Sequence, residues 1–100
     1  MQKELNIGSN RGRPRLWIEG KFLLASNWNC GDRWNVDPQP NRLVLSKDAE
    51  GKRKVAGTAQ RPIIDMVGKV IEDAFDCNAV SRVIIVATAN QIVISEANLK

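Results

Sequence analysis

The side chains of this sequence that are best suited to chemistry are basic, and that chemistry is the binding of a polyanion. The tract Asn10-Arg11-Gly12-Arg13-Pro14-Arg15 places three arginines within five residues. Such a peptide lies extended, and its guanidinium groups fit the narrow, strongly negative minor groove of A·T-rich DNA. In the alternative interpretation, Arg13-Pro14 merely opens a β-strand. Arg11, Arg13 and Arg15 are therefore candidate DNA contacts.

A second basic cluster, Lys52-Arg53-Lys54, precedes a predicted strand. Solvated charge in a linker is the alternative explanation for such a cluster. If both tracts lay at one end of the fold, as we expect, their six cations would bind phosphates in a salt-dependent manner. Lys21 follows a glycine at a predicted helix start and is a further candidate for phosphate binding, whereas Lys69 is interpreted as solvated.

The three tryptophans, Trp17, Trp28 and Trp34, all lie in the first half of the chain. We expect Trp28 to be buried behind the first helix. Trp17 alternates with apolar neighbours and is expected to face outward. Trp17 and Trp34 are candidate partner contacts, through stacking on bases or an apolar protein surface, although tryptophans more often belong to a core.

The sequence contains few residues in arrangements typical of catalysis. The sequence has no histidine, which removes the commonest general base and metal ligand. Carboxylates such as Asp32 and Asp65 show no spacing typical of an acid–base pair. Cys30 and Cys77 are too few for a disulfide framework or a four-ligand zinc site and are interpreted as buried thiols in a reducing compartment. We therefore expect no enzymatic activity, no cofactor and no metal.

The charge is unevenly distributed. The chain of 100 residues carries a net charge of +4, with 13 Lys/Arg against seven Asp/Glu in residues 1–69 and two against four in residues 70–100. A hydrophobic content of 43% predicts one globular domain. No apolar run reaches the length of a membrane span or a signal peptide. We expect a cytoplasmic protein, nucleoid-associated if it binds DNA.

An internal repeat appears when the chain is shifted against itself by 48 residues, and by 49 near the end. We expect repeat one at 13–48 and repeat two at 61–96, with a basic N-terminal arm at 1–12, a linker strand at 49–60 and a tail at 97–100. The matched positions are Arg13-Pro14 with Arg61-Pro62, Gly20-Lys21 with Gly68-Lys69, Val36 with Ile84, and Leu43-Val44-Leu45 with Ile92-Val93-Ile94.

Each repeat predicts the order strand, helix, strand, strand. Prolines should keep the connection Pro38–Asn41 out of any central strand. The predicted elements of repeat one are strand 15–19, helix 21–26, and strands 33–37 and 42–46; those of repeat two are strand 62–66, helix 68–75, and strands 81–87 and 91–96, with 52–56 extending the sheet between the repeats.

A single unit of this kind cannot bury its apolar face, because chains below about 40 residues rarely hold a core alone. Two units must pack together, and interleaved hairpins would close sheet edges that otherwise stay exposed. The predicted fold is mainly β with two short helices, a swapped-hairpin β-barrel formed by two pseudo-symmetric repeats in one chain.

A family resemblance agrees with this fold. The run from Ile18 to Asp32, IEGKFLLASNWNCGD, followed by Val36 and Arg42-Leu43-Val44-Leu45, resembles the AbrB-like swapped-hairpin superfamily, and within it the SymE-type toxin domain. Asn27, the hairpin prolines and the absence of a Gly-Asp turn in repeat two depart from the family pattern. The Arg-Gly-Arg-Pro tetrapeptide also resembles the core of an AT-hook.

The resemblance implies a DNA-binding protein, such as a bacterial, phage or plasmid regulator or a nucleoid-associated factor. Two other functions stay open. One is a protein-interaction module, for example a phage or plasmid inhibitor of a host protein, and the other is a SymE-like toxin that acts on RNA. We expect DNA rather than RNA as the partner, no membrane contact, and a monomer or homodimer.

Overall fold

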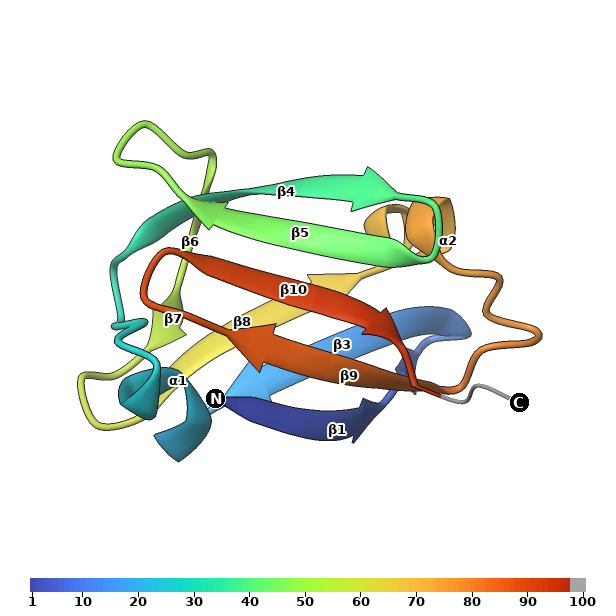
Figure 1. Ribbon diagram of the computed structural model, residues 1–100, viewed down its shortest axis with the longest axis horizontal. Coiled ribbons are helices and arrows are strands. Elements are labelled where there is room, and N and C mark those ends of the chain that lie inside the picture. Colours follow the sequence, from blue (N-terminus) through green and yellow to red (C-terminus); the bar gives the residue numbers. More distant parts are fainter. Residues whose placement is uncertain (98–100) are drawn as a thin grey trace.

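Ten strands and two short helices make up residues 1–97, the part of the chain that the computed structural model describes (Figure 1). In chain order they are β1 (Gln2–Asn6), β2 (Gly8–Asn10), β3 (Arg13–Glu19), α1 (Lys21–Ala25), β4 (Arg33–Gln39), β5 (Arg42–Lys47), β6 (Arg53–Lys54), β7 (Ala56–Gly57), β8 (Pro62–Val67), α2 (Lys69–Ala74), β9 (Arg82–Ala87) and β10 (Gln91–Glu96). The predicted mainly β class with two short helices is confirmed, but the predicted closed β-barrel is wrong, because the described strands divide into two separate sheets.

The strands form two antiparallel sheets. The six-stranded sheet has the order β1-β9-β10-β5-β4-β6 and lies in front of the four-stranded sheet, β2-β3-β8-β7, in Figure 1. Alternate side chains of each sheet point into the space between them, because successive residues of a strand face opposite sides. Leu16, Ile18, Ile64 and Met66 from one sheet therefore share a core with residues such as Leu45 from the other.

The β4–β5 hairpin extends further than expected, because β4 continues through Pro38 to Gln39. Proline cannot donate a ladder hydrogen bond and is tolerated only where a strand edge is open. The outer neighbour, β6, pairs only with Arg33 and Trp34. Pro38 therefore lies on an open stretch of edge, and the prediction that it stands outside the strand is wrong.

Residues 2–10, expected to belong to a basic arm, form two strands instead. β1 pairs with β9 along its whole length, and β2 pairs with β3. Leu5 on β1 and Ile7, which lies between the two strands, pack against the core. Burial of these two side chains and the backbone pairing hold the segment on the fold, so residues 1–12 do not project as an arm.

The segment expected as a linker strand is divided between the two sheets. β6 pairs with β4 and β7 with β8, while Val55 between them is buried. Its backbone N–H donates to the Asp32 carbonyl, 2.8 Å from N to O. At the other end of the molecule the Ile7 N–H donates to the Ser81 carbonyl at 2.9 Å, so residues 4–9 and 52–57 make equivalent connections.

Equivalent backbone hydrogen bonds recur at offsets of 48 or 49 residues throughout the fold. Register places Val36 opposite Leu45 and Ile85 opposite Ile94, so Val36 corresponds to Ile85 and not to Ile84 as predicted. The inserted residue therefore precedes β9. The recurring donor and acceptor pairs include Gly20 N to Pro62 O with Gly68 N to Pro14 O, and Asp48 N to Arg33 O with Ala97 N to Arg82 O.

Each hairpin tip reaches the helix of the other half of the chain. The Asn41 N–H, at the tip of β4–β5, donates to the Ala74 carbonyl at the end of α2. Trp28, just after α1, is fully buried, as predicted, and its indole Nε1 donates to the Thr88 carbonyl at the tip of β9–β10, at 2.8 Å. The two halves are thus tied together at both ends.

Candidate nucleic-acid interface

The two basic tracts lie at opposite ends of the molecule, so the prediction that they gather at one end is wrong. β3 and β8 pair with Arg15 opposite Val67 at one end and Glu19 opposite Ile63 at the other. Arg11 precedes the Arg15 end, whereas β7, which follows Lys54, pairs with Ile63 at the Glu19 end. Figure 1 shows the β2–β3 turn on the right and β6 on the left.

Arg13 and Arg15 are already bound to carboxylates. The Arg13 guanidinium donates to Glu72 at 3.1 and 2.9 Å, and the Arg15 guanidinium donates to both oxygens of Asp65 at 3.0 Å. Hydrogen bonding to Glu72 and to Asp65 raises the pKa of Arg13 and Arg15, respectively. A phosphate would have to displace these carboxylates, which makes both arginines weak candidates for nucleic-acid contacts.

Arg11 lies at the tip of the two-residue turn that joins β2 to β3. Its φ of 54° and the φ of 80° at Gly12 match a type I′ hairpin turn, in which both central residues have positive φ. The side chain is exposed and has no ion-pair partner among residues 1–97. Arg11 is therefore the one arginine of this tract that is free of a carboxylate among the described residues, and a single cation is a weak site.

The cationic cluster consists of Arg33, Lys52, Arg53 and Lys54, at the edge where β6 pairs with β4. Register places Arg33 directly opposite Lys54, and the Arg53 guanidinium lies 5.5 Å from the centre of the Trp34 ring. Arg33 donates to the Gly51 carbonyl at 3.0 Å. Within the described chain, none of the four forms an ion pair with a carboxylate.

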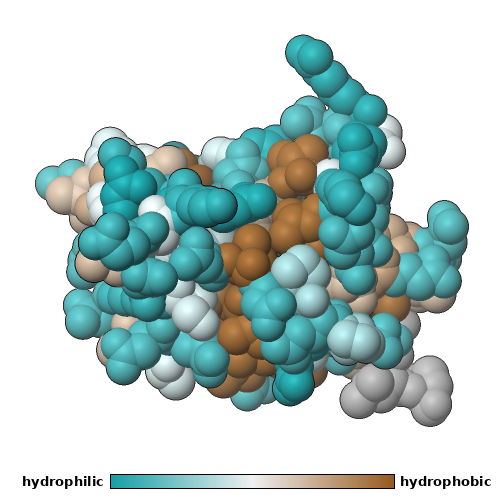
Figure 2. Space-filling model, turned by 90° about the horizontal axis from the view of Figure 1, so that it is seen from above, coloured by the Kyte–Doolittle hydropathy of each residue, from teal (hydrophilic) through white to brown (hydrophobic). Residues whose placement is uncertain are grey.

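Two carboxylates lie in the turn that precedes this cluster. Asp48 accepts a hydrogen bond from the Asn35 amide at 3.0 Å, and Glu50 forms no ion pair among the residues described. Four cations against two carboxylates leave this edge positive. Figure 2, which views the molecule from above Figure 1, shows hydrophilic side chains over the end that carries β6 and apolar ones nearer the middle.

The equivalent edge at the other end of the molecule is neutralised. There β1 pairs with β9 with Asn6 opposite Arg82, as Lys54 lies opposite Arg33. Glu4, which occupies the position of Lys52, forms an ion pair with Arg82. The same backbone arrangement therefore holds an ion pair at one end and like charges at the other.

Lys21 opens α1, at the end of the molecule that also carries β6 (Figure 1). The preceding Gly20 has a φ of 71°, a conformation that favours glycine because glycine has no Cβ atom. The Lys21 side chain is exposed and forms no ion pair in the described part of the chain. The helix dipole of a five-residue helix is small, so only the ammonium group of Lys21 would attract a phosphate here.

Of the two tryptophans expected to contact a partner, only Trp17 is exposed. Its side chain faces out from β3 with 37% exposure, next to Arg15, whose guanidinium lies 4.5 Å from the ring centre. Trp34 is 2% exposed, and the expectation of a partner contact there is wrong. The turn before β6 covers it so closely that a Cβ atom on Gly51 would lie 2.6 Å from the Trp34 backbone nitrogen.

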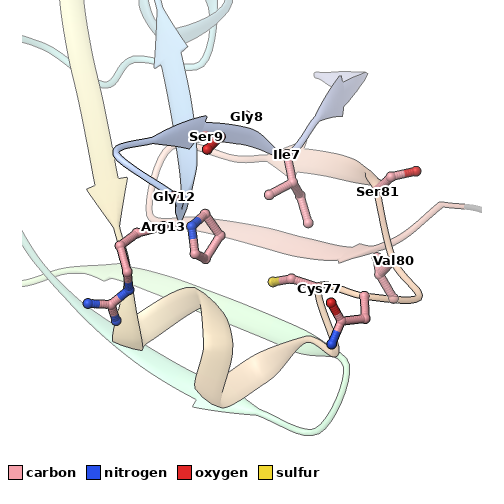
Figure 3. A pocket seen from close by; sticks show the side chains of 10 residues that line it. Ile7, Gly8, Ser9, Gly12, Arg13, Cys77, Val80 and Ser81 are labelled. Carbon is pink, nitrogen blue, oxygen red and sulfur yellow. The ribbon is translucent and has the colours of Figure 1, made fainter.

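A pocket of about 250 Å³ lies at the end opposite the cationic cluster, between the start of the chain and the loop after α2. Figure 3 shows Ile7 and the Cys77 thiol directed toward it, while the Arg13 guanidinium points away. Cys77 and Cys30 are both exposed, so the expectation that these thiols are buried is wrong. Partial desolvation, Glu72 and Asp76 raise the pKa of Cys77, so the thiol stays protonated near neutral pH. The Cys77 thiol is therefore not activated as a nucleophile, and residues 1–97 contain no group of three His, Cys, Asp or Glu side chains suited to a metal.

The Arg13–Glu72 pair predicts a small pH effect on stability. The bond to Arg13 lowers the pKa of Glu72 below its ordinary 4.5, so its contribution is complete above that pH and is lost as pH falls through the lowered value. Thermal unfolding followed from neutral pH to about pH 3 should show a shallower acid decline for Glu72→Gln than for the natural sequence. Glu50→Gln serves as the control, and an equally shallow decline there would contradict the assignment.

No helix in the described chain is long and apolar enough to cross a membrane. Comparison of the chain with family models, with curated proteins and with solved structures gave no match.

Proposed function

We propose that this protein binds nucleic acid, with duplex DNA as the preferred partner, through the cationic cluster and Lys21. The observation that carries the proposal is the juxtaposition of Arg33 and Lys54 across β4 and β6, with no carboxylate paired to either within residues 1–97. Like charges directly opposite each other destabilise a sheet. A phosphate backbone is the partner that would offset this repulsion.

The equivalent edge supports the proposal, because the same backbone arrangement forms there without four cations. Glu4 and Arg82 neutralise each other on β1 and β9, in positions that correspond to Lys52 and Arg33. Lysines on an edge strand also discourage aggregation, but one lysine suffices for that role. The excess charge is better explained by phosphate binding.

The fold that we propose around this site is a swapped-hairpin arrangement of the AbrB type, made from two diverged copies in one chain. Recurring hydrogen bonds at 48 or 49 residues, and hairpin tips that pack on the opposite helix, support it. The copies include the N-terminal strands, so they run over about 2–48 and 50–97. A regulator or nucleoid-associated protein of bacterial, phage or plasmid origin fits such a fold.

The test is a salt-series titration of the Lys52→Gln, Arg53→Gln, Lys54→Gln triple variant against duplex DNA, single strands and RNA. Each lost phosphate contact makes the slope of log affinity against log salt shallower by about 0.9, so three lost contacts weaken binding about 500-fold near 0.1 M salt. The matched control is Arg42→Gln, Lys69→Gln, Arg82→Gln, which removes the same charge elsewhere.

Equal losses in the two triple variants would mean that net charge alone drives binding, and unchanged affinity in both would discard the cluster as the site. Tighter binding of RNA than of duplex DNA would redirect the proposal to a SymE-like RNA-binding toxin. These outcomes separate the location of the site from the identity of its ligand.

A second candidate function is contact with a protein through the outer face of the β3–β8 sheet. Trp17 and Val67 are 37% and 40% exposed and lie in neighbouring rows of this sheet. The flanking Arg15 and Arg61 are paired with Asp65 and Glu19, which makes the face neutral and poorly suited to phosphates. Binding there would be insensitive to salt and reduced by Trp17→Ala.

A further inference from the structure

We propose that the protein holds nucleic acid at one end only, so that each chain carries a single site although its two halves are built alike. This inference rests on the proposed function and concerns its stoichiometry. The two equivalent ends lie at either extreme of a molecule about 35 Å long. A fold with two matched basic ends would bridge two duplexes, whereas this one would bind a single duplex.

The difference between the ends is local and can be followed position by position. The strand pairing shows which positions correspond. Lys54 lies opposite Arg33 as Asn6 lies opposite Arg82, and the residues before them pair in the same order. The triplet Lys52-Arg53-Lys54 therefore corresponds to Glu4-Leu5-Asn6. Arg53 covers the ring of Trp34, whereas Leu5 packs against the core. Of the three positions, none carries a cation on β1.

Several of the remaining cations near the β1 end are engaged, whereas Arg11 and Arg42 form no ion pair among the described residues. Arg82 is paired with Glu4, Arg13 with Glu72, and Lys69 with Asp73 at 3.0 Å. Their counterparts at the β6 end are Arg33, Arg61 and Lys21, and of these only Arg61 is paired, with Glu19. In the described structure, pairing within the chain therefore leaves only separate unpaired cations such as Arg11 at one end, whereas the other end keeps the four unpaired cations of the cationic cluster together.

The test measures how many duplexes one chain binds. A DNA hairpin of about eight base pairs, about 27 Å long, is short enough for each end to take its own copy. With the hairpin in excess at low salt, sedimentation velocity should give one hairpin per chain for the natural sequence. The Glu4→Lys, Asn6→Lys variant places two lysines beside Arg82, as Lys52 and Lys54 lie beside Arg33, and should bind two hairpins.

Two hairpins per chain for the natural sequence would overturn the inference, as would a folded Glu4→Lys, Asn6→Lys variant that still binds one. If circular dichroism showed that variant to be unfolded, the triple glutamine variant of the cluster would decide the question. A site of undiminished affinity remaining in that protein would mean that the other end also binds. Absence of salt-dependent binding by the natural sequence would instead reject the proposed function itself.

Discussion

Replacing Lys52 with glutamate is expected to weaken nucleic-acid binding about 100-fold near 0.1 M salt while leaving the thermal unfolding midpoint unchanged or slightly higher. The substitution reverses one charge and gives Arg33 the partner that Arg82 has in Glu4. Two cations are thus withdrawn from phosphate by one change. The Lys52 backbone N–H, which donates to Asn35 Oδ1 at 3.1 Å, is unaffected, so the edge should keep its geometry.

Lys52→Gln separates the loss of a charge from the formation of a pair. It should weaken binding by about tenfold and reduce the salt slope by about 0.9, the value for one contact. In the Arg33→Gln background, Lys52→Glu should weaken binding less, because Arg33 is no longer there to be captured. Full affinity in Lys52→Glu, with a salt slope equal to that of the natural sequence, would exclude this edge from the interface.

Strands with one buried face could be predicted from alternation alone. β3 alternates the buried Leu16 and Ile18 with half-buried or exposed residues, and β8 and β10 show the same pattern around Ile64 and Ile94. Their predicted bounds agree with the structure to within two residues. The order of strand, helix, strand and strand in each repeat follows from the same signal.

The N-terminal strands could not be predicted in this way, because they lie at the edges of both sheets. β1 and β2 are polar, and only Leu5 and Ile7 contact the core from this segment. Two apolar positions are too few to show a period. The signal that existed was the match of Ile7 to Val55 at the repeat offset, which becomes visible once the repeat is extended toward the N-terminus.

The residue types of the candidate site could be predicted from the sequence, but their positions and partners in the fold could not. Arg13 and Arg15 meet carboxylates 59 and 50 residues away, and nothing in the local sequence predicts such partners. Trp34 is buried because β6 returns across it, which again depends on pairing between distant segments. Charge type is a property of the residue, whereas availability to a ligand depends on the register of the sheets.

The interleaving of the halves has a consequence for stability. If each hairpin tip is anchored on the helix of the other half, neither half holds a complete core, and the chain should unfold in one cooperative transition. Trp28 is the larger of these anchors. Its ring is fully buried, Lys47 Nζ lies 5.2 Å from the ring centre, and its indole nitrogen binds the Thr88 carbonyl.

Trp28→Ala is therefore expected to cost about 3–5 kcal/mol, and to lower the unfolding midpoint by about 15–25 °C. Trp17→Ala deletes the same atoms from an indole that is 37% exposed and should cost less than about 1 kcal/mol. Calorimetry of both variants checks the comparison. Since Trp28 joins α1 to β9–β10, its loss should lower a single transition; two separate transitions, with only one shifted, would mean that the halves fold independently and that their hairpins are not exchanged.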